Sequence, residues 1–150
     1  MAHTYTNLMY HGVFSTKHRR DLLTPDLMAE LAKVVGGIIR DRDGKLLAMG
    51  GIPNHVHLLS IFHPKHAVSD VFRDIKAVSS NWIHRRFSGL RDFAWQEGYG
   101  AFSVSRSNVG NVEQYISRQA EHHRRRTFQE ELIVLLERHG IDYDRRHVFD

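Results

Sequence analysis

The segment from Met49 to Phe62 places two histidines inside a run that has the composition of a buried strand. Only Val56 separates His55 from His57, and apolar residues flank the pair. Because residues i and i+2 of a strand point to the same face, the two imidazoles are predicted to stand side by side. Such a pair is half of a site for a divalent cation. The alternative is a pair of structural histidines whose ring nitrogens bond to neighbours, and the apolar flanks weaken it.

Hydrophobic periodicity divides the rest of the chain into strands and helices. Thr24-Pro25 is typical of a helix N-cap followed by proline in the first turn. Asp43-Gly44 is typical of a closing turn, and the glycine-rich turn at 50–54 indicates a hairpin. The expected strands span 5–16, 45–49, 55–62 and 93–105; the expected helices span 25–42, a stretch after Pro64 that ends at Arg86, about 107–125, and 128–138.

This order, βαββαβ followed by further helices, predicts an α+β chain of the ferredoxin-like class, with an antiparallel sheet and two helices on one face. Additional C-terminal helices carry Tyr115. The prediction leaves the second face of the sheet open, with room there for the histidine pair. No repeat, linker or low-complexity stretch interrupts the sequence, so we expect one domain over residues 1–150.

Composition narrows the choice of partners and chemistry. The net charge is +4, and arginine accounts for most of the 21 basic residues, which favours an anionic partner such as nucleic acid. The chain has no cysteine, which excludes disulfides, thiolate catalysis and cysteine-based zinc sites. No apolar run approaches the roughly 20 residues of a membrane helix. The N-terminus lacks the regions of a signal peptide, so the expected location is the cytoplasm.

Tyr115 borders the apolar stripe of the helix expected at 107–125, and Gln119 lies four residues later on the same face. One hypothesis makes Tyr115 a nucleophile and Gln119 a third, oxygen ligand beside the two imidazoles. A phenol has a pKa of about 10, so it needs a nearby cation or base to react at neutral pH. The alternative is a half-buried tyrosine that only packs against a neighbouring element.

These motifs together resemble a known family. His55-Val56-His57 is similar to the His-hydrophobic-His signature of the HUH endonuclease superfamily. With the segments 115–119 and 121–124 and the run 95–105, the chain resembles the single-tyrosine transposases of small insertion sequences (IS200/IS605-like), which move as single-stranded DNA. The resemblance extends from about Tyr5 to Arg126.

The resemblance implies a metal-dependent, single-strand-specific DNA transposase. His55, His57 and Gln119 would hold Mg²⁺ or Mn²⁺ as a Lewis acid on the scissile phosphate, and Mn²⁺ suits imidazole better. Tyr115 would attack the phosphorus and leave a 5′-phosphotyrosine and a free 3′-hydroxyl, and a 3′-hydroxyl of another strand would resolve it. The implied partners are single-stranded DNA with hairpin or palindromic ends, and a second copy of the chain in a homodimer with shared active sites.

Basic residues in two regions are candidates for DNA contact: Arg73 and Lys76, and the run of His122, His123, Arg124, Arg125 and Arg126. The run follows Tyr115 by one to three helical turns, which favours phosphate contact. Solvated helix faces and ends explain the same residues. Trp95 and Tyr99 are candidates for stacking on unpaired bases, although packing in the core or at a dimer interface is the simpler role.

Three alternatives fit the same residues. In the first, the cleavage reaction is the same but the biological role differs: the protein is a domesticated relative that processes palindromes, or a replication or conjugation nickase. The second is a non-catalytic RNA- or single-stranded-DNA-binding module on the same fold, which would display aromatic residues on its central strands. The third is a metal-dependent phosphoesterase that activates water, with Tyr115 structural. A covalent protein–DNA adduct distinguishes the transposase from this hydrolase.

Overall fold

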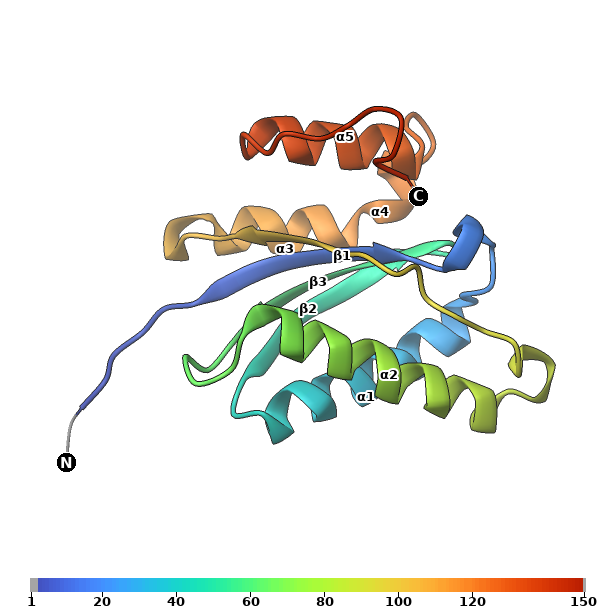
Figure 1. Ribbon diagram of the computed structural model, residues 1–150, viewed down its shortest axis with the longest axis horizontal. Coiled ribbons are helices and arrows are strands. Elements are labelled where there is room, and N and C mark those ends of the chain that lie inside the picture. Colours follow the sequence, from blue (N-terminus) through green and yellow to red (C-terminus); the bar gives the residue numbers. More distant parts are fainter. Residues whose placement is uncertain (1–2, 150) are drawn as a thin grey trace.

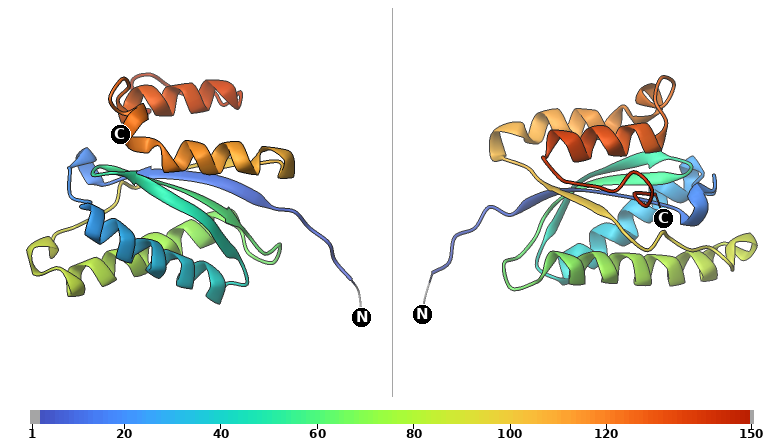
Figure 2. Two further views of the ribbon diagram at one scale, coloured as in Figure 1. Left: turned by 180° about the vertical axis from the view of Figure 1, so that it is seen from behind. Right: turned by 45° about the horizontal axis from the view of Figure 1, so that its top comes forward.

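A four-stranded antiparallel sheet forms the middle layer of this computed structural model, which describes residues 3–149 (Figure 1). Its strands lie in the order β2-β3-β1-β4, with β1 at Met9–Ser15, β2 at Lys45–Ile52, β3 at His55–Ile61 and β4 at Gly100–Ser103. Helices α1 (Pro25–Asp41) and α2 (Val68–Arg86) cover one face. Helices α3 (Val109–Ser117), α4 (Gln119–His122) and α5 (Phe128–Arg138) lie on the other side (Figure 2).

The central strand β3 divides its residues between two apolar layers. Val56 and Leu58 pack into the main core with α1 and α2. Leu59 belongs to the cluster on the opposite face, beneath α3. Because side chains alternate along a strand, His55 and His57 share this second face with Leu59.

The ferredoxin-like α+β fold predicted from the order of elements is confirmed. The second face of the sheet is covered, however, where the sequence left it open. Helix α3 packs on β2 and β3, and α5 packs on Val13 of β1 and Phe102 of β4. The histidine pair therefore lies in an interior layer between the sheet and the C-terminal helices.

The helix predicted at 107–125 is wrong in its extent. The backbone leaves helical geometry at Arg118, which has φ −105° and ψ 23°, and this residue separates α3 from α4. No apolar residue follows Ala120 before Thr127, so the basic run has no face to bury and cannot continue a packed helix. The break brings Gln119 into the interior, where it is 2 % exposed.

Three strands also differ from their predicted ranges. Strand β2 continues to Ile52, past the predicted end at residue 49, because Gly50, Gly51 and Ile52 pair with β3. The first strand begins at Met9, where its pairing with β3 starts, and not at Tyr5. In the expected strand at 93–105, only Gly100–Ser103 joins the sheet, while Trp95 forms an isolated bridge to Thr16.

Helix α5 begins as the sequence predicts. Thr127 and Glu130 form a capping box at its N-terminus, each side chain bonding to the other's backbone N–H. The buried face consists of Phe128, Glu131, Leu132 and Leu135. A carboxylate thus enters the apolar layer next to the histidines.

None of the helices formed by residues 3–149 is long and apolar enough to cross a membrane.

Candidate active site

Five side chains converge beneath α3 and α5. His55 and His57 stand side by side on β3 with ring centroids 5.0 Å apart, and both are fully buried. Gln119 comes from α4, His123 follows that helix directly, and Glu131 comes from α5. One ligand atom from each of the three histidines and from Glu131 lies within 4.8 Å of all the others.

The carboxylate of Glu131 is the centre of this cluster. Its Oε1 atom lies 2.9 Å from Nε2 of His57 and 3.2 Å from Nε2 of both His55 and His123. Gln119 Oε1 lies 3.1 Å from Nε2 of His55 and of His123. Three imidazole nitrogens and two side-chain oxygens therefore point into one small volume.

Two polar neighbours orient the histidine pair. His55 Nδ1 donates a hydrogen bond to Asn54 Oδ1 over 2.8 Å, so its Nε2 carries the lone pair. His57 Nδ1 lies 2.8 Å from Nε2 of His11 on β1. Burial, followed by the charge of His57, lowers the pKa of His11 to about 3. His11 is thus a neutral ring that fixes the orientation of His57, as outer partners do for metal-binding histidines.

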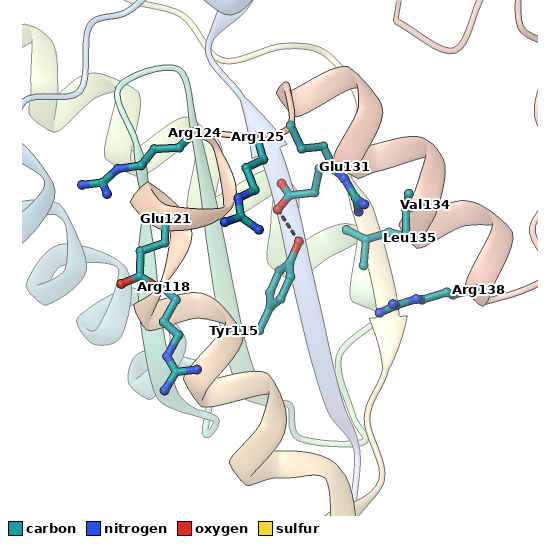
Figure 3. A pocket seen from close by; sticks show the side chains of 10 residues that line it. Tyr115, Arg118, Glu121, Arg124, Arg125, Glu131, Val134, Leu135 and Arg138 are labelled. Carbon is teal, nitrogen blue, oxygen red and sulfur yellow. Dashed lines mark hydrogen bonds between the residues drawn. The ribbon is translucent and has the colours of Figure 1, made fainter.

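Tyr115 reaches the same carboxylate from α3. Its hydroxyl donates a hydrogen bond to Oε2 of Glu131 (Figure 3). The phenol ring stands edge-on to His57 and His11, with centroid distances of 5.6 and 5.9 Å. The candidate nucleophile and the histidine pair therefore share one buried carboxylate.

Burial and hydrogen bonding set the charges in this cluster. Burial, and after it the bond to Glu131, raises the pKa of Tyr115 above its ordinary value. Burial alone would also raise the pKa of Glu131, but the close contacts of its carboxylate with the three imidazoles outweigh burial and hold that pKa far below the ordinary range. Burial lowers the pKa of His55. At neutral pH the site combines an ionised carboxylate, a neutral His55 imidazole and a neutral phenol.

This donor set fits a divalent cation. Lone pairs on imidazole nitrogens and side-chain oxygens repel one another at about 3 Å unless a positive charge lies among them. A first-row metal with bonds of about 2.0–2.2 Å brings its ligand atoms to roughly 3–4.4 Å from one another. The observed spread, within 4.8 Å, is close to this range. His55, His57 and Gln119, which the sequence singled out as ligands, are all in the cluster.

A cavity of about 650 Å³ lies beside Tyr115 and Glu131 (Figure 3). Two glutamates, Glu121 and Glu131, are among its lining residues. Five arginines line it from both sides of the tyrosine: Arg118, Arg124, Arg125, Arg126 and Arg138. The excess of guanidinium groups suits the phosphodiester backbone of a nucleic acid.

The predicted DNA-binding residues fall into different environments. Arg124, Arg125 and Arg126 line the cavity. His123 instead turns inward to the cluster, where its side chain is 6 % exposed. The side chain of His122 lies outside the described part of the chain.

Arg73 and Lys76 lie on α2, on the other side of the sheet, and both side chains have partners within the fold. Arg73 pairs with Asp70 and Asp74. The Lys76 ammonium donates hydrogen bonds to the backbone carbonyls of residues 96–98. Contact of these two side chains with DNA stays a prediction.

The two aromatic candidates for base stacking also pack within the fold. Trp95 is 7 % exposed and lies in the main core. Tyr99 stacks on Phe72, with ring centroids 4.4 Å apart, but is 38 % exposed at the surface. These contacts give both rings the packing role that the sequence favoured.

Neither Glu131, at the centre of the cluster, nor His11, the partner of His57, was predicted from the sequence as part of the site. Glu131 lies three residues after Phe128 and one before Leu132, on the apolar face of α5, and a carboxylate on such a face was a usable signal. His11 occupies a strand with aromatic and apolar neighbours, in the same way as His55. The sequence does not show that these strands and helices meet, so neither residue could be joined to the pair.

The sequence matches a family described as "Transposase IS200 like" over residues 4–119. The transposase for insertion sequence element IS200 of Salmonella typhimurium is 30 % identical over 131 residues, which cover 81 % of this chain and 82 % of that protein. The ISDra2 transposase TnpA of Deinococcus radiodurans is 24 % identical over 117 residues, which cover 75 % of this chain and 84 % of that protein.

Two solved structures have a similar fold. A proposed transposase of Deinococcus radiodurans R1 aligns with a TM-score of 0.64 at 25 % identity, covering 79 % of this chain and 96 % of that chain. A REP-associated tyrosine transposase, solved with a bound REP hairpin, aligns with a TM-score of 0.61 at 18 % identity, covering 82 % of this chain and 73 % of that chain.

Proposed function

The chain belongs to the family of IS200-like transposases, enzymes that act on DNA, and we propose that it cleaves and rejoins single-stranded DNA through a covalent bond to Tyr115. The observation that carries this proposal is the position of the Tyr115 hydroxyl. It bonds to the carboxylate at the centre of the histidine cluster and lies beside a cavity lined by five arginines. A phosphodiester that enters this cavity meets a nucleophile, cationic side chains and a candidate metal site together.

The covalent step follows from the groups around Tyr115. The phenol oxygen attacks the phosphorus, a tyrosine–phosphate bond forms, and the bond from phosphorus to the 3′-oxygen breaks. Glu131 Oε2, which already accepts the hydrogen bond of the phenol, holds the attacking oxygen in place. The phenol proton leaves to water, and the departing 3′-oxygen takes a proton from water. A 3′-hydroxyl then reverses the step on the phosphotyrosine, so rejoining needs no nucleotide cofactor.

The raised pKa of Tyr115 makes the resting phenol a weak nucleophile, so positive charge is required near it. Arg126 supplies part of this charge from the cavity. His55, His57 and Gln119 are the proposed ligands of Mg²⁺ or Mn²⁺, and such a cation, when bound, polarises the scissile phosphate as a Lewis acid.

The proposed substrate is single-stranded DNA that carries hairpin or palindromic ends. The REP hairpin bound by the structural relative supports a hairpin partner for this chain. The arginine-lined cavity supports backbone contact near the tyrosine, because guanidinium groups bind phosphate in a bidentate way.

The homodimer, the single transposase domain over residues 1–150 and the cytoplasmic location stay proposals. One chain already brings Tyr115 and Gln119 to its own His55 and His57. A site shared between subunits therefore requires α3 and the helices after it to leave this sheet and cover that of the partner.

The proposal is tested by covalent trapping. The protein is incubated with labelled single-stranded oligonucleotides that carry the hairpins of its own flanking DNA, with Mn²⁺ or Mg²⁺, and resolved under denaturing conditions. We expect a DNA adduct with wild-type protein, and none with Tyr115→Phe or with His55→Ala/His57→Ala. Glu113→Gln, a change on an exposed residue of the same helix, is the matched control and should form the adduct normally.

Two outcomes contradict the proposal. Metal-dependent cleavage without an adduct indicates a hydrolase that uses water. Binding of the hairpin DNA without cleavage or adduct indicates a nucleic-acid-binding module.

A further inference from the structure

Glu131 and His123 lie beyond residues 4–119, the part of the chain that matches the family, yet both side chains are buried in the cluster. The three groups implied by the resemblance are His55, His57 and Gln119. The structure adds a third imidazole and a carboxylate to them. The buried carboxylate needs an explanation, because burial of a charged group costs free energy unless the group is paired. The third imidazole, which lies beside it, needs one as well.

The contacts of Glu131 assign different partners to its two oxygens. Oε1 faces Nε2 of His55, His57 and His123 at 2.9–3.2 Å. Oε2 instead accepts hydrogen bonds from the hydroxyl of Tyr115 and from the amide of Gln119. Oε1 is thus directed toward the imidazole nitrogens, and Oε2 toward the nucleophile.

His123 is oriented like a ligand as well. Its Nε2 lies 3.1 Å from Gln119 Oε1 and 3.2 Å from Glu131 Oε1. Its ring packs edge-on against His55, with centroids 4.6 Å apart. A histidine that only contacted DNA phosphate would face the cavity, whereas this ring faces the interior beside the histidine pair.

We propose that His123 and Glu131 are additional metal ligands, so that the chain binds its metal with three imidazoles, one carboxylate and one amide oxygen. The inference rests on the proposed function for the metal role of His55, His57 and Gln119. Such a set is richer in nitrogen than Mg²⁺ prefers, and it suits Mn²⁺ or a later first-row metal. All five ligands belong to a single chain, so metal binding needs no second subunit.

The second oxygen gives Glu131 a further role as a positioning residue. With Oε1 among the imidazole nitrogens and Oε2 on the Tyr115 hydroxyl, this carboxylate would link the position of the nucleophile to that of the proposed metal ligands. Substitution of Glu131 therefore weakens metal binding and loosens Tyr115 together, whereas substitution of His123 weakens metal binding alone.

The test measures Mn²⁺ affinity without DNA, by titration calorimetry and by electron paramagnetic resonance of the free ion. The variants are Glu131→Gln, which keeps the shape of the side chain, and His123→Ala. Glu137→Gln, the same change at an exposed position of α5, is the matched control, and circular dichroism checks that each variant is folded. We expect at least tenfold weaker Mn²⁺ binding for both site variants and no change for the control. His123→Ala, which loses a nitrogen ligand, should also show a smaller preference for Mn²⁺ over Mg²⁺.

The outcomes separate this inference from the proposed function. If Mn²⁺ binding survives in folded His123→Ala and Glu131→Gln but is lost in His55→Ala/His57→Ala, the two extra ligands are refuted and the three-residue site stands. If His55→Ala/His57→Ala also binds Mn²⁺ normally, the proposed metal site fails and this inference fails with it. If Glu131→Gln does not fold, His123→Ala decides alone.

Discussion

Lys76 extends from α2 to the segment before β4, where its ammonium donates hydrogen bonds to the carbonyls of residues 96–98. Its charge also lies over the ring of Phe14, 5.2 Å from the centroid. The sequence alone presented this lysine as a candidate for DNA contact. Its partners instead give it the task of holding an irregular segment against α2, because each carbonyl there would otherwise lose its donor.

Lys76→Met is therefore expected to affect stability more than DNA binding. Methionine keeps most of the apolar stem but removes the donors, and charged hydrogen bonds contribute about 1.5–3 kcal/mol each in favourable cases. We expect a loss of roughly 2 kcal/mol in the free energy of unfolding, measured by urea denaturation. Lys65→Met, at an exposed surface pair with Asp43, should change it little. Full stability combined with weakened DNA binding would show that this interpretation of Lys76 is wrong.

Arg125, unlike Lys76, lies where DNA is proposed to bind, because it lines the cavity beside Tyr115. Arg125→Gln should weaken binding of single-stranded DNA and reduce the salt dependence by about 0.7 in the slope of log K against log[salt], the contribution of one phosphate contact. Fluorescence anisotropy at several salt concentrations measures both quantities. Arg40→Gln, at an exposed position of α1 on the other side of the sheet, is the control. Equal slopes for the two variants would show that Arg125 does not contact the DNA.

At the scale of elements, the close contact between α3 and β2 positions the catalytic tyrosine candidate. A Cβ atom at Gly50 would lie 2.9 Å from the backbone carbonyl oxygen of Ile116, the residue after Tyr115. Backbone cannot move aside as a flexible side chain can, so any larger residue at Gly50 must push α3 away from the sheet. The position of α3, and with it that of Tyr115, thus depends on the absence of a side chain at Gly50.

Gly50→Ala is expected to slow adduct formation by at least tenfold, because displacements of about 1 Å in an active site can cost a factor of 100. It should also lower stability by about 1–3 kcal/mol. Gly36→Ala in α1 is the control: the nearest atom to its new Cβ is 3.7 Å away, and alanine favours the helix by about 0.5–1 kcal/mol. Normal adduct formation by Gly50→Ala would mean that α3 does not need this close approach.

The elements themselves were largely predictable, for local reasons. Thr24 accepts the expected capping bond from Leu27, and the apolar stripes of α1 and α2 face the sheet. What the sequence could not give was the break at Arg118, because the residues on either side fit a single helical period. The break accompanies the burial of Gln119 against the histidines, which is a contact between segments far apart in the chain.

At the scale of the whole molecule, the fold brings β3, α3 and α5 together in one chain. The sequence predicted His55, His57, Tyr115 and Gln119 as one site, and the structure brings all four together. Glu131 could not be included, because a pattern of single residues does not show that α5 returns over the sheet. The order of elements predicts the layer formed by α1 and α2. The second layer, formed by α3, α4 and α5, depends on apolar helix faces whose packing partners the sequence does not identify.

Mixing two inactive variants tests whether one chain completes the site. His55→Ala/His57→Ala lacks the histidine pair and Tyr115→Phe lacks the nucleophile, so the arrangement in this structure predicts no adduct in their mixture. The two proteins carry tags of different size, are co-expressed, and are then incubated with hairpin DNA and Mn²⁺. An adduct on the histidine-deficient chain would show that α3 works over the sheet of a partner subunit.

The role of Tyr115 is tested by identifying the residue to which the DNA becomes attached. The trapped adduct is digested with trypsin and nuclease, and the modified peptide is sequenced by mass spectrometry. We expect a nucleotide on the peptide 107–118, whose single tyrosine is Tyr115. Attachment at Tyr10, Tyr99 or any other residue would contradict it.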